Sequence, residues 1–196
     1  MMYQNQFKTV ENRTVIRPLA VAAAGFLTGL LMILSTQVCQ EYSVFNLLYT
    51  FGQMSSGLLL WAVICTVIAL KAGNPGYAAR DVLCFLVPMI AITGLTGYIT
   101  NCFGWFGETL LACRIAALLP AAGAAAIIWT VRRSQTMAWL SIPFASLMFW
   151  FDSIAILDGE PLPMLAEFLL LAGFAWMVLH TSRAHVSQCQ AAQFAK

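Results

Sequence analysis

The sequence has few charges for its length. Of 196 residues, 9% are charged and 61% are hydrophobic, whereas a soluble domain has about 25% charged residues. This composition excludes an ordinary water-soluble globule. The formal net charge of +2 is too small to indicate a nucleic-acid partner, so no nucleic acid is expected to bind.

Motifs for catalysis and metal binding are missing as well. The six cysteines form no C-x-x-C pair, and the sequence has no H-E-x-x-H, G-x-S-x-G or G-x-x-x-x-G-K-[ST]. Neither of its two histidines falls inside a long apolar run. The sequence therefore predicts no metal site, no cofactor and no enzymatic activity.

Long apolar runs are what the sequence does contain. A transmembrane helix needs about 20 apolar residues, and these runs lack the alternation of a transmembrane barrel strand. We therefore predict an all-α, single-domain protein of the lipid bilayer over residues 1–196. Six spans with short connections are expected, at about 18–35, 45–70, 82–100, 109–131, 137–157 and 164–179. The first is expected to be an uncleaved signal anchor, because no small-x-small cleavage site accompanies it.

Basic residues lie on only one side of the predicted spans. Nine of the ten precede the first span, follow the sixth, or lie in the second–third and fourth–fifth links. They are Lys8, Arg13, Arg17, Lys71, Arg80, Arg132, Arg133, Arg183 and Lys196. The remaining links contain acidic residues and no lysine or arginine. By the positive-inside rule, both termini are expected in the cytoplasm, with the chain in a bacterial plasma membrane.

Two cysteines fall in the links on the outer side, Cys39 and Cys102. If the exterior is oxidising they can form a disulfide, and otherwise both remain free thiols. The sequence leaves both alternatives open.

Three ionisable residues are predicted inside the spans at one depth. Asp152, in the stretch LMFWFDSIAIL, lies about five residues, or about 8 Å, below the outer end of its span. Arg114 lies at a similar depth on the preceding span, and Glu167 about one turn into the next. A charge at the bilayer centre costs about 3 kcal/mol, so we expect the guanidinium to pair with one or both carboxylates. The remaining negative charge would be balanced by a proton, a cationic ligand or water.

Further polar side chains are predicted in the same outer half of the membrane. They are Tyr49, Gln53, Tyr98 and Asn101. Together with the three charged residues they predict a polar, outward-facing pocket for a small cationic or polar solute. The alternative is a salt-bridged network that fastens the helices together and binds nothing.

Small residues and prolines shape the predicted helix surfaces. Ala20 and Ala24 are four residues apart in the first span, which predicts a face that another membrane protein can approach closely. Packing within the chain is the alternative. Pro88, Pro120 and Pro143 lie inside predicted spans, where each removes a backbone hydrogen bond and favours a kink.

One pattern of small residues, tryptophans, prolines and an arginine extends over the part of the sequence that contains the second to fifth predicted spans. Its residues are Ser56, Gly57, Trp61, Pro75, Arg80, Pro120 and Trp129. In this pattern the chain resembles a group of small bacterial six-span membrane proteins of unknown function, which implies a six-span fold and no particular activity. In shape, the expected bundle is also similar to the substrate-binding subunits of energy-coupling-factor vitamin transporters. That similarity implies contact with a transmembrane partner through Ala20 and Ala24.

We therefore expect a small-solute binding or transport module, on the evidence of charges at one depth and kinked helices. The alternative is a non-catalytic structural or regulatory membrane subunit, for example a partner of an ABC-type permease. The small-residue faces favour this alternative.

Overall fold

The computed structural model describes residues 2–37, 50–52, 54–55, 57–99, 111–112, 114–131, 134–155 and 161–194. Within these ranges it describes side chains between Ile16 and Arg183, except at residues 97 and 155. Its long elements are all helices: α1 (Met2–Gln37), α3 (Leu59–Leu70), α4 (Pro75–Ile99), α6 (Leu118–Val131), α7 (Gln135–Ala155) and α8 (Pro161–Phe194). For this part of the chain, the all-α prediction is confirmed.

Five of the helical segments are long and apolar enough to cross a membrane. They are Ile16–Ser35, Pro75–Thr96, Arg114–Val131, Gln135–Ile154 and Pro161–Arg183. Their outer surfaces leave large apolar side chains exposed, such as Leu119 at 85% and Trp176 at 68%. Contiguous apolar surface of this kind is unfavourable in water and favourable against lipid. The chain is therefore a helical membrane protein.

The second predicted span, 45–70, is not one continuous helix. Residues 45–49 lie outside the described part, and the chain bends at Gly57 and Leu58 before α3 begins at Leu59. With 12 residues, α3 is too short to cross a bilayer by itself. At this bend, the N–H groups of Leu58 and Leu59 donate to a side chain of another helix, α7. The sixth span is therefore not established by the structure.

Other helix ends also differ from the sequence prediction. α4 begins at Pro75, before the predicted residue 82, because Asn74 Oδ1 accepts a 2.7 Å bond from the Tyr77 N–H and caps the helix. α6 begins only at Leu118, after a turn at Ala117. Pro120, which has no N–H, lies in its first turn, where proline is tolerated. α8 continues far beyond the predicted residue 179.

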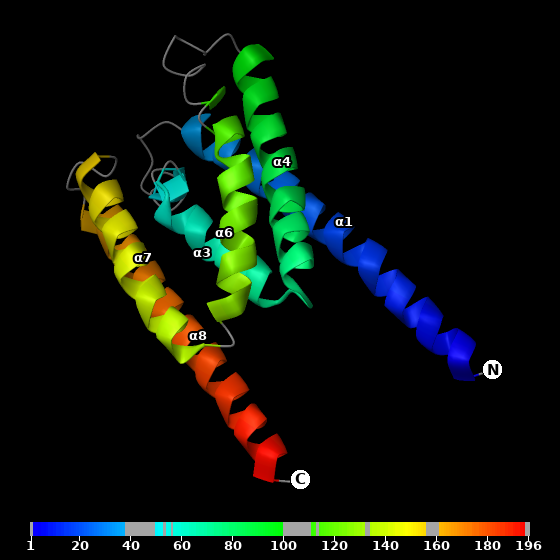
Figure 1. Ribbon diagram of the computed structural model, residues 1–196. Helices are drawn as coiled ribbons and strands as arrows, with labels where there is room; N and C mark the ends of the chain where they lie inside the picture. The colour runs from blue at the N-terminus through cyan, green and yellow to red at the C-terminus, as the bar shows by residue number, and fades with distance from the viewer. Residues whose placement is uncertain are drawn as a thin grey trace.

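α3 lies at the centre of the bundle. α1 packs along α4, α4 along α6, and α7 along α8, whereas α3 contacts α4, α6, α7 and α8 (Figure 1). One buried cluster joins α3 to α4 and α6 through residues such as Ala69, Phe85 and Trp129. The other joins it to α7 and α8 through Leu59 and Phe174. Because both cores include α3, a shift of this helix would disturb both halves.

α1 approaches α4 through two glycines. A Cβ at Gly25 would overlap the carbonyl oxygen of Phe85, and a Cβ at Gly29 would overlap Cγ2 of the Ile92 side chain and lie 3.1 Å from the carbonyl oxygen of Met89. Contact of this kind between the backbones is the packing that a G-x-x-x-G spacing permits in membrane helices.

Charged residues join α1, α3 and α4 where α3 ends. Arg17 Nη1 donates to the carbonyl oxygen of Lys71 at 2.7 Å, and its Nε lies 2.9 Å from Asp81 Oδ2. Arg80 Nη2 contacts the other oxygen of the buried Asp81 at 2.9 Å. Arg17 thus supplies positive charge to the carboxyl end of α3, where a helix dipole favours a cation.

Candidate functional site

Two buried carboxylates from α7 and α8 meet beside the turn that precedes α3. Asp152 and Glu167 are both fully buried. A Cβ built on Gly57 would lie 2.7 Å from Asp152 Oδ2 and 3.0 Å from Glu167 Oε1. The two oxygens therefore cannot be farther apart than the sum of these distances. We call these two residues the acidic pair.

Asp152 caps α3 from another helix. Its Oδ2 accepts hydrogen bonds from the backbone N–H groups of Leu58 and Leu59, each at 2.8 Å. The first N–H groups of a helix have no partner within the helix, and the dipole there favours a negative charge. Leu58, at the N-cap position, has no side-chain hydrogen-bond acceptor. The carboxylate of Asp152 therefore accepts bonds from the first N–H groups of the helix, as the side chain of an N-cap serine or aspartate does in other helices.

Much of the hydrogen-bonding capacity of the acidic pair is unused. Within the described residues, Asp152 Oδ1 and both carboxylate oxygens of Glu167 are buried without a hydrogen-bond partner, as is the hydroxyl of Ser153. Burying an ionised carboxylate without compensation is costly. The described residues contain no group of three or more His, Cys, Asp or Glu side chains able to hold a metal ion.

The structure brings together two of the three charged residues that were expected to meet. Arg114 is half-buried on helical residues before α6, and it forms no ion pair with either carboxylate among the residues that are described. Two backbone N–H groups, and not the guanidinium of Arg114, donate to Asp152. This arrangement became available because the chain breaks at Gly57, which the apolar pattern of the span did not reveal.

The other predicted site residues do not gather around the acidic pair where the structure describes them. Tyr98 is 80% exposed near the end of α4, and Ala20 and Ala24 are exposed on α1. The remaining predicted residues lie outside the described part of the chain: Tyr49, Gln53 and Asn101 of the polar pocket, and Cys39 and Cys102 of the possible disulfide.

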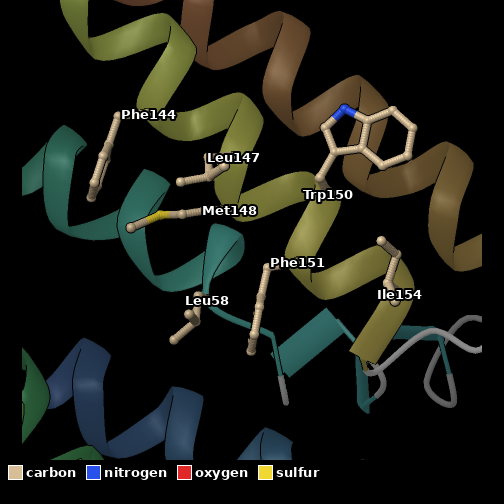
Figure 2. A pocket seen from close by; sticks show the side chains of 7 residues that line it. All are labelled: Leu58, Phe144, Leu147, Met148, Trp150, Phe151 and Ile154. Atoms are coloured by element: carbon tan, nitrogen blue, oxygen red, sulfur yellow. The ribbon is translucent and has the colours of Figure 1, made fainter.

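A shallow apolar cavity of about 590 Å³, wide open to the molecular surface and lined mostly by exposed side chains, lies along α7. Its lining consists of Leu58, Phe144, Leu147, Met148, Trp150, Phe151 and Ile154. Figure 2 shows six of these side chains projecting from α7 and Leu58 projecting from the turn before α3. Leu58 links the cavity to the acidic pair, because its side chain lines the cavity while its N–H donates to Asp152. None of the residues predicted to bind a solute lines this cavity.

The sequence prediction missed the part played by Gly57 and by the backbone of Leu58 and Leu59. Gly57 entered only through the family resemblance, as a small residue before Trp61. A glycine inside an apolar run is the signal that could have indicated a helix break or a close approach there. Trp61 holds the same turn, because its indole N–H donates to the carbonyl oxygen of Ser55 at 2.8 Å.

No protein-family model matches the chain, and no curated protein and no solved structure matches it. The function proposed below therefore depends on the residues of the site themselves.

Proposed function

We propose that this protein is a small-solute binding or transport module of the membrane, with its site at the acidic pair. The observation that carries the proposal is the break at Gly57, where the start of α3 meets two buried carboxylates. At membrane depth, non-helical backbone is tolerated where protein buries it or where it lines a cavity. Broken helices of this kind hold substrates and coupling ions in many transporters.

The charge of the acidic pair favours a small cationic or polar solute. Ionisable residues inside membrane spans usually belong to ion or substrate pathways, because their insertion is costly. Three carboxylate oxygens of the pair have no hydrogen-bond partner among the described residues, so they can accept donors from a solute. In this proposal, Arg114, Tyr49, Gln53 and Asn101 contribute to an outward-facing polar pocket around the pair, whereas Tyr98, exposed near the end of α4, does not.

We also propose six spans, of which the second is discontinuous and ends in α3. Arg17, Lys71 and Arg80 gather at one end of the bundle, where α3 ends and α4 begins. This clustering supports the positive-inside assignment, with both termini in the cytoplasm of a bacterial cell.

A second candidate function is that of a non-catalytic structural or regulatory subunit, such as a partner of an ABC-type permease. α1 packs mainly on α4, and Ala20 and Ala24 are exposed on it. A surface of small residues lets a partner helix approach closely in the membrane.

A ligand screen with matched variants tests the solute-binding proposal. The protein, purified in detergent, is heated with cationic metabolites and vitamins, and unfolding is followed by tryptophan fluorescence. A ligand at about 100 times its Kd adds about 2.7 kcal/mol to the stability of the folded state, which raises the unfolding midpoint.

The Asp152→Asn, Glu167→Gln double variant should lose that rise in the midpoint. Ser146→Ala is the control, because this α7 serine donates only to the carbonyl oxygen of Ile142 in its own helix. An equal rise in the double variant would show that the solute binds elsewhere. If no compound stabilises the wild-type protein, the second candidate becomes the better one.

A further inference from the structure

We propose that the acidic pair is a proton-binding site, in which Glu167 holds an exchangeable proton beside the carboxylate of Asp152. This inference goes beyond the proposed function, because the proton site would exist whether or not the protein binds a solute. It assigns different roles to two carboxylates that the sequence presents as equivalent.

Asp152 lies where two hydrogen-bond donors face one of its carboxylate oxygens. One of its oxygens accepts two backbone N–H bonds of 2.8 Å, and an acceptor of this kind is strongest when it is ionised. Both donors belong to the start of α3, where the helix dipole adds further attraction for a negative charge. A proton on Asp152 would weaken this cap.

The surroundings of Glu167 favour its neutral form. Its side chain is fully buried, and neither carboxylate oxygen has a hydrogen-bond partner among the described residues. The negative charge that lies close by belongs to Asp152, and two buried like charges at this distance repel each other strongly.

A single proton relieves the repulsion between the two carboxylates. When a proton adds to one carboxylate oxygen of Glu167, the new O–H group is a donor beside Asp152, whose Oδ1 is buried without a partner in the described part of the chain. The pair then carries one negative charge, and this charge faces the two N–H groups of α3.

The helices around Glu167 bring few other ionisable groups to it. α8 packs against α7 and α3. The only ionisable side chain of α7 is Asp152, and α3 has only Cys65, about two turns from its start. On α8 itself, the next ionisable residue is His180, more than about three turns further along. Among the described residues of these helices, Asp152 is therefore the ionisable group that acts on the proton of Glu167.

Infrared spectroscopy of the full chain in lipid nanodiscs tests the proposal, because a protonated carboxylic acid has a carbonyl band that a carboxylate lacks. At neutral pH the wild-type protein should show one such band. Glutamate labelled with ¹³C in its side-chain carboxyl group should shift the band, and labelled aspartate should not. The band should disappear completely in Glu167→Gln, and it should be lost from the wild-type protein at alkaline pH. In Asp152→Asn, where the neighbouring negative charge is gone, it should be lost at a lower pH than in the wild-type protein.

Several results would overturn the proposal. They are a spectrum without the band from acid to neutral pH, a band that labelled aspartate shifts, and a band that persists in Glu167→Gln. Absence of the band together with stabilisation by Na⁺ would assign the pair to a metal cation. The isotope result needs only the wild-type protein, so it stands if a variant fails to fold. If the carbonyl band is present but no solute raises the unfolding midpoint, only the proposed function is contradicted. If a solute raises the midpoint but the band is absent, only the proton site is contradicted.

Discussion

The backbone N–H of Leu59 donates a 2.8 Å hydrogen bond to Asp152 Oδ2, although the two residues are 93 positions apart in the chain. At its other end the same helix, α3, is contacted by Arg17, which donates to the carbonyl oxygen of Lys71. An anion at the start of a helix and a cation at its end both complement the helix dipole. Charges from α7 and α1 therefore hold this short central helix in place.

Replacing each carboxyl group of the acidic pair by an amide should have unequal effects on stability. Asp152→Asn should lower the free energy of unfolding by about 1–2 kcal/mol, because a neutral amide oxygen is a weaker acceptor for the N–H groups of α3. Glu167→Gln should change it by less than about 0.5 kcal/mol, because glutamine has the shape and charge of a protonated glutamate. Chemical or thermal unfolding in detergent, followed by tryptophan fluorescence, measures both changes.

Ser146→Ala serves as the reference for a polar change on α7 away from the pair. If Glu167→Gln destabilises the protein as much as Asp152→Asn, the unequal roles of the two carboxylates are refuted.

Adding a methyl group at Gly57 should displace the acidic pair. In Gly57→Ala the new Cβ would lie 2.7 Å from Asp152 Oδ2 and 3.0 Å from Glu167 Oε1. Because two N–H bonds hold Asp152 in place, its carboxylate can move only by weakening the cap, at a cost of about 1 kcal/mol. The unfolding midpoint should therefore fall.

Gly173→Ala is the matched control for this substitution, because nothing lies within 4 Å of a Cβ at Gly173 in α8. Alanine favours a helix over glycine by up to about 1 kcal/mol, so this control should be neutral or stabilising. Equal midpoints for the two variants would contradict the close approach at Gly57.

The contact between α1 and α4 should not tolerate larger residues on its glycine face. Gly25→Ala and Gly29→Ala should each cost about 1–3 kcal/mol. The new Cβ at residue 25 meets the α4 backbone at Phe85, and the one at residue 29 meets the side chain of Ile92 and the backbone of Met89. Gly123→Ala provides the comparison, since its Cβ would meet no atom within 4 Å. Thermal unfolding and the yield of folded protein in detergent report the loss, and a fall of the same size in Gly123→Ala would remove the contact as its cause.

Reporter fusions to the two termini distinguish six spans from five. Green fluorescent protein fluoresces after folding in the cytoplasm, whereas alkaline phosphatase becomes active only outside it. With six spans, fluorescent protein fused to either terminus should be bright, and phosphatase fused after Lys196 should be inactive. An active phosphatase at the C-terminus with a fluorescent N-terminus would mean five spans, with α3 not completing a crossing.

Much of the architecture could be predicted locally. Long apolar runs select helices in lipid because each backbone polar group must then find its partner within its own helix. The runs of α1, α4, α7 and α8 were therefore recognised. Helix ends were predicted less well, because they depend on single capping interactions, such as that of Asn74 with Tyr77.

The sequence by itself determined that this is a helical membrane protein with two acids, Asp152 and Glu167, in neighbouring apolar runs. Hydropathy and charge are properties of each residue, so they can be determined from the sequence without coordinates. Only the tertiary structure decided that Asp152 bonds to the backbone of α3 and not to Arg114, and that Gly25 and Gly29 form the contact of α1 with α4. Such contacts depend on how neighbouring helices rotate and break, and a helix break exposes N–H groups that a hydropathy pattern does not record.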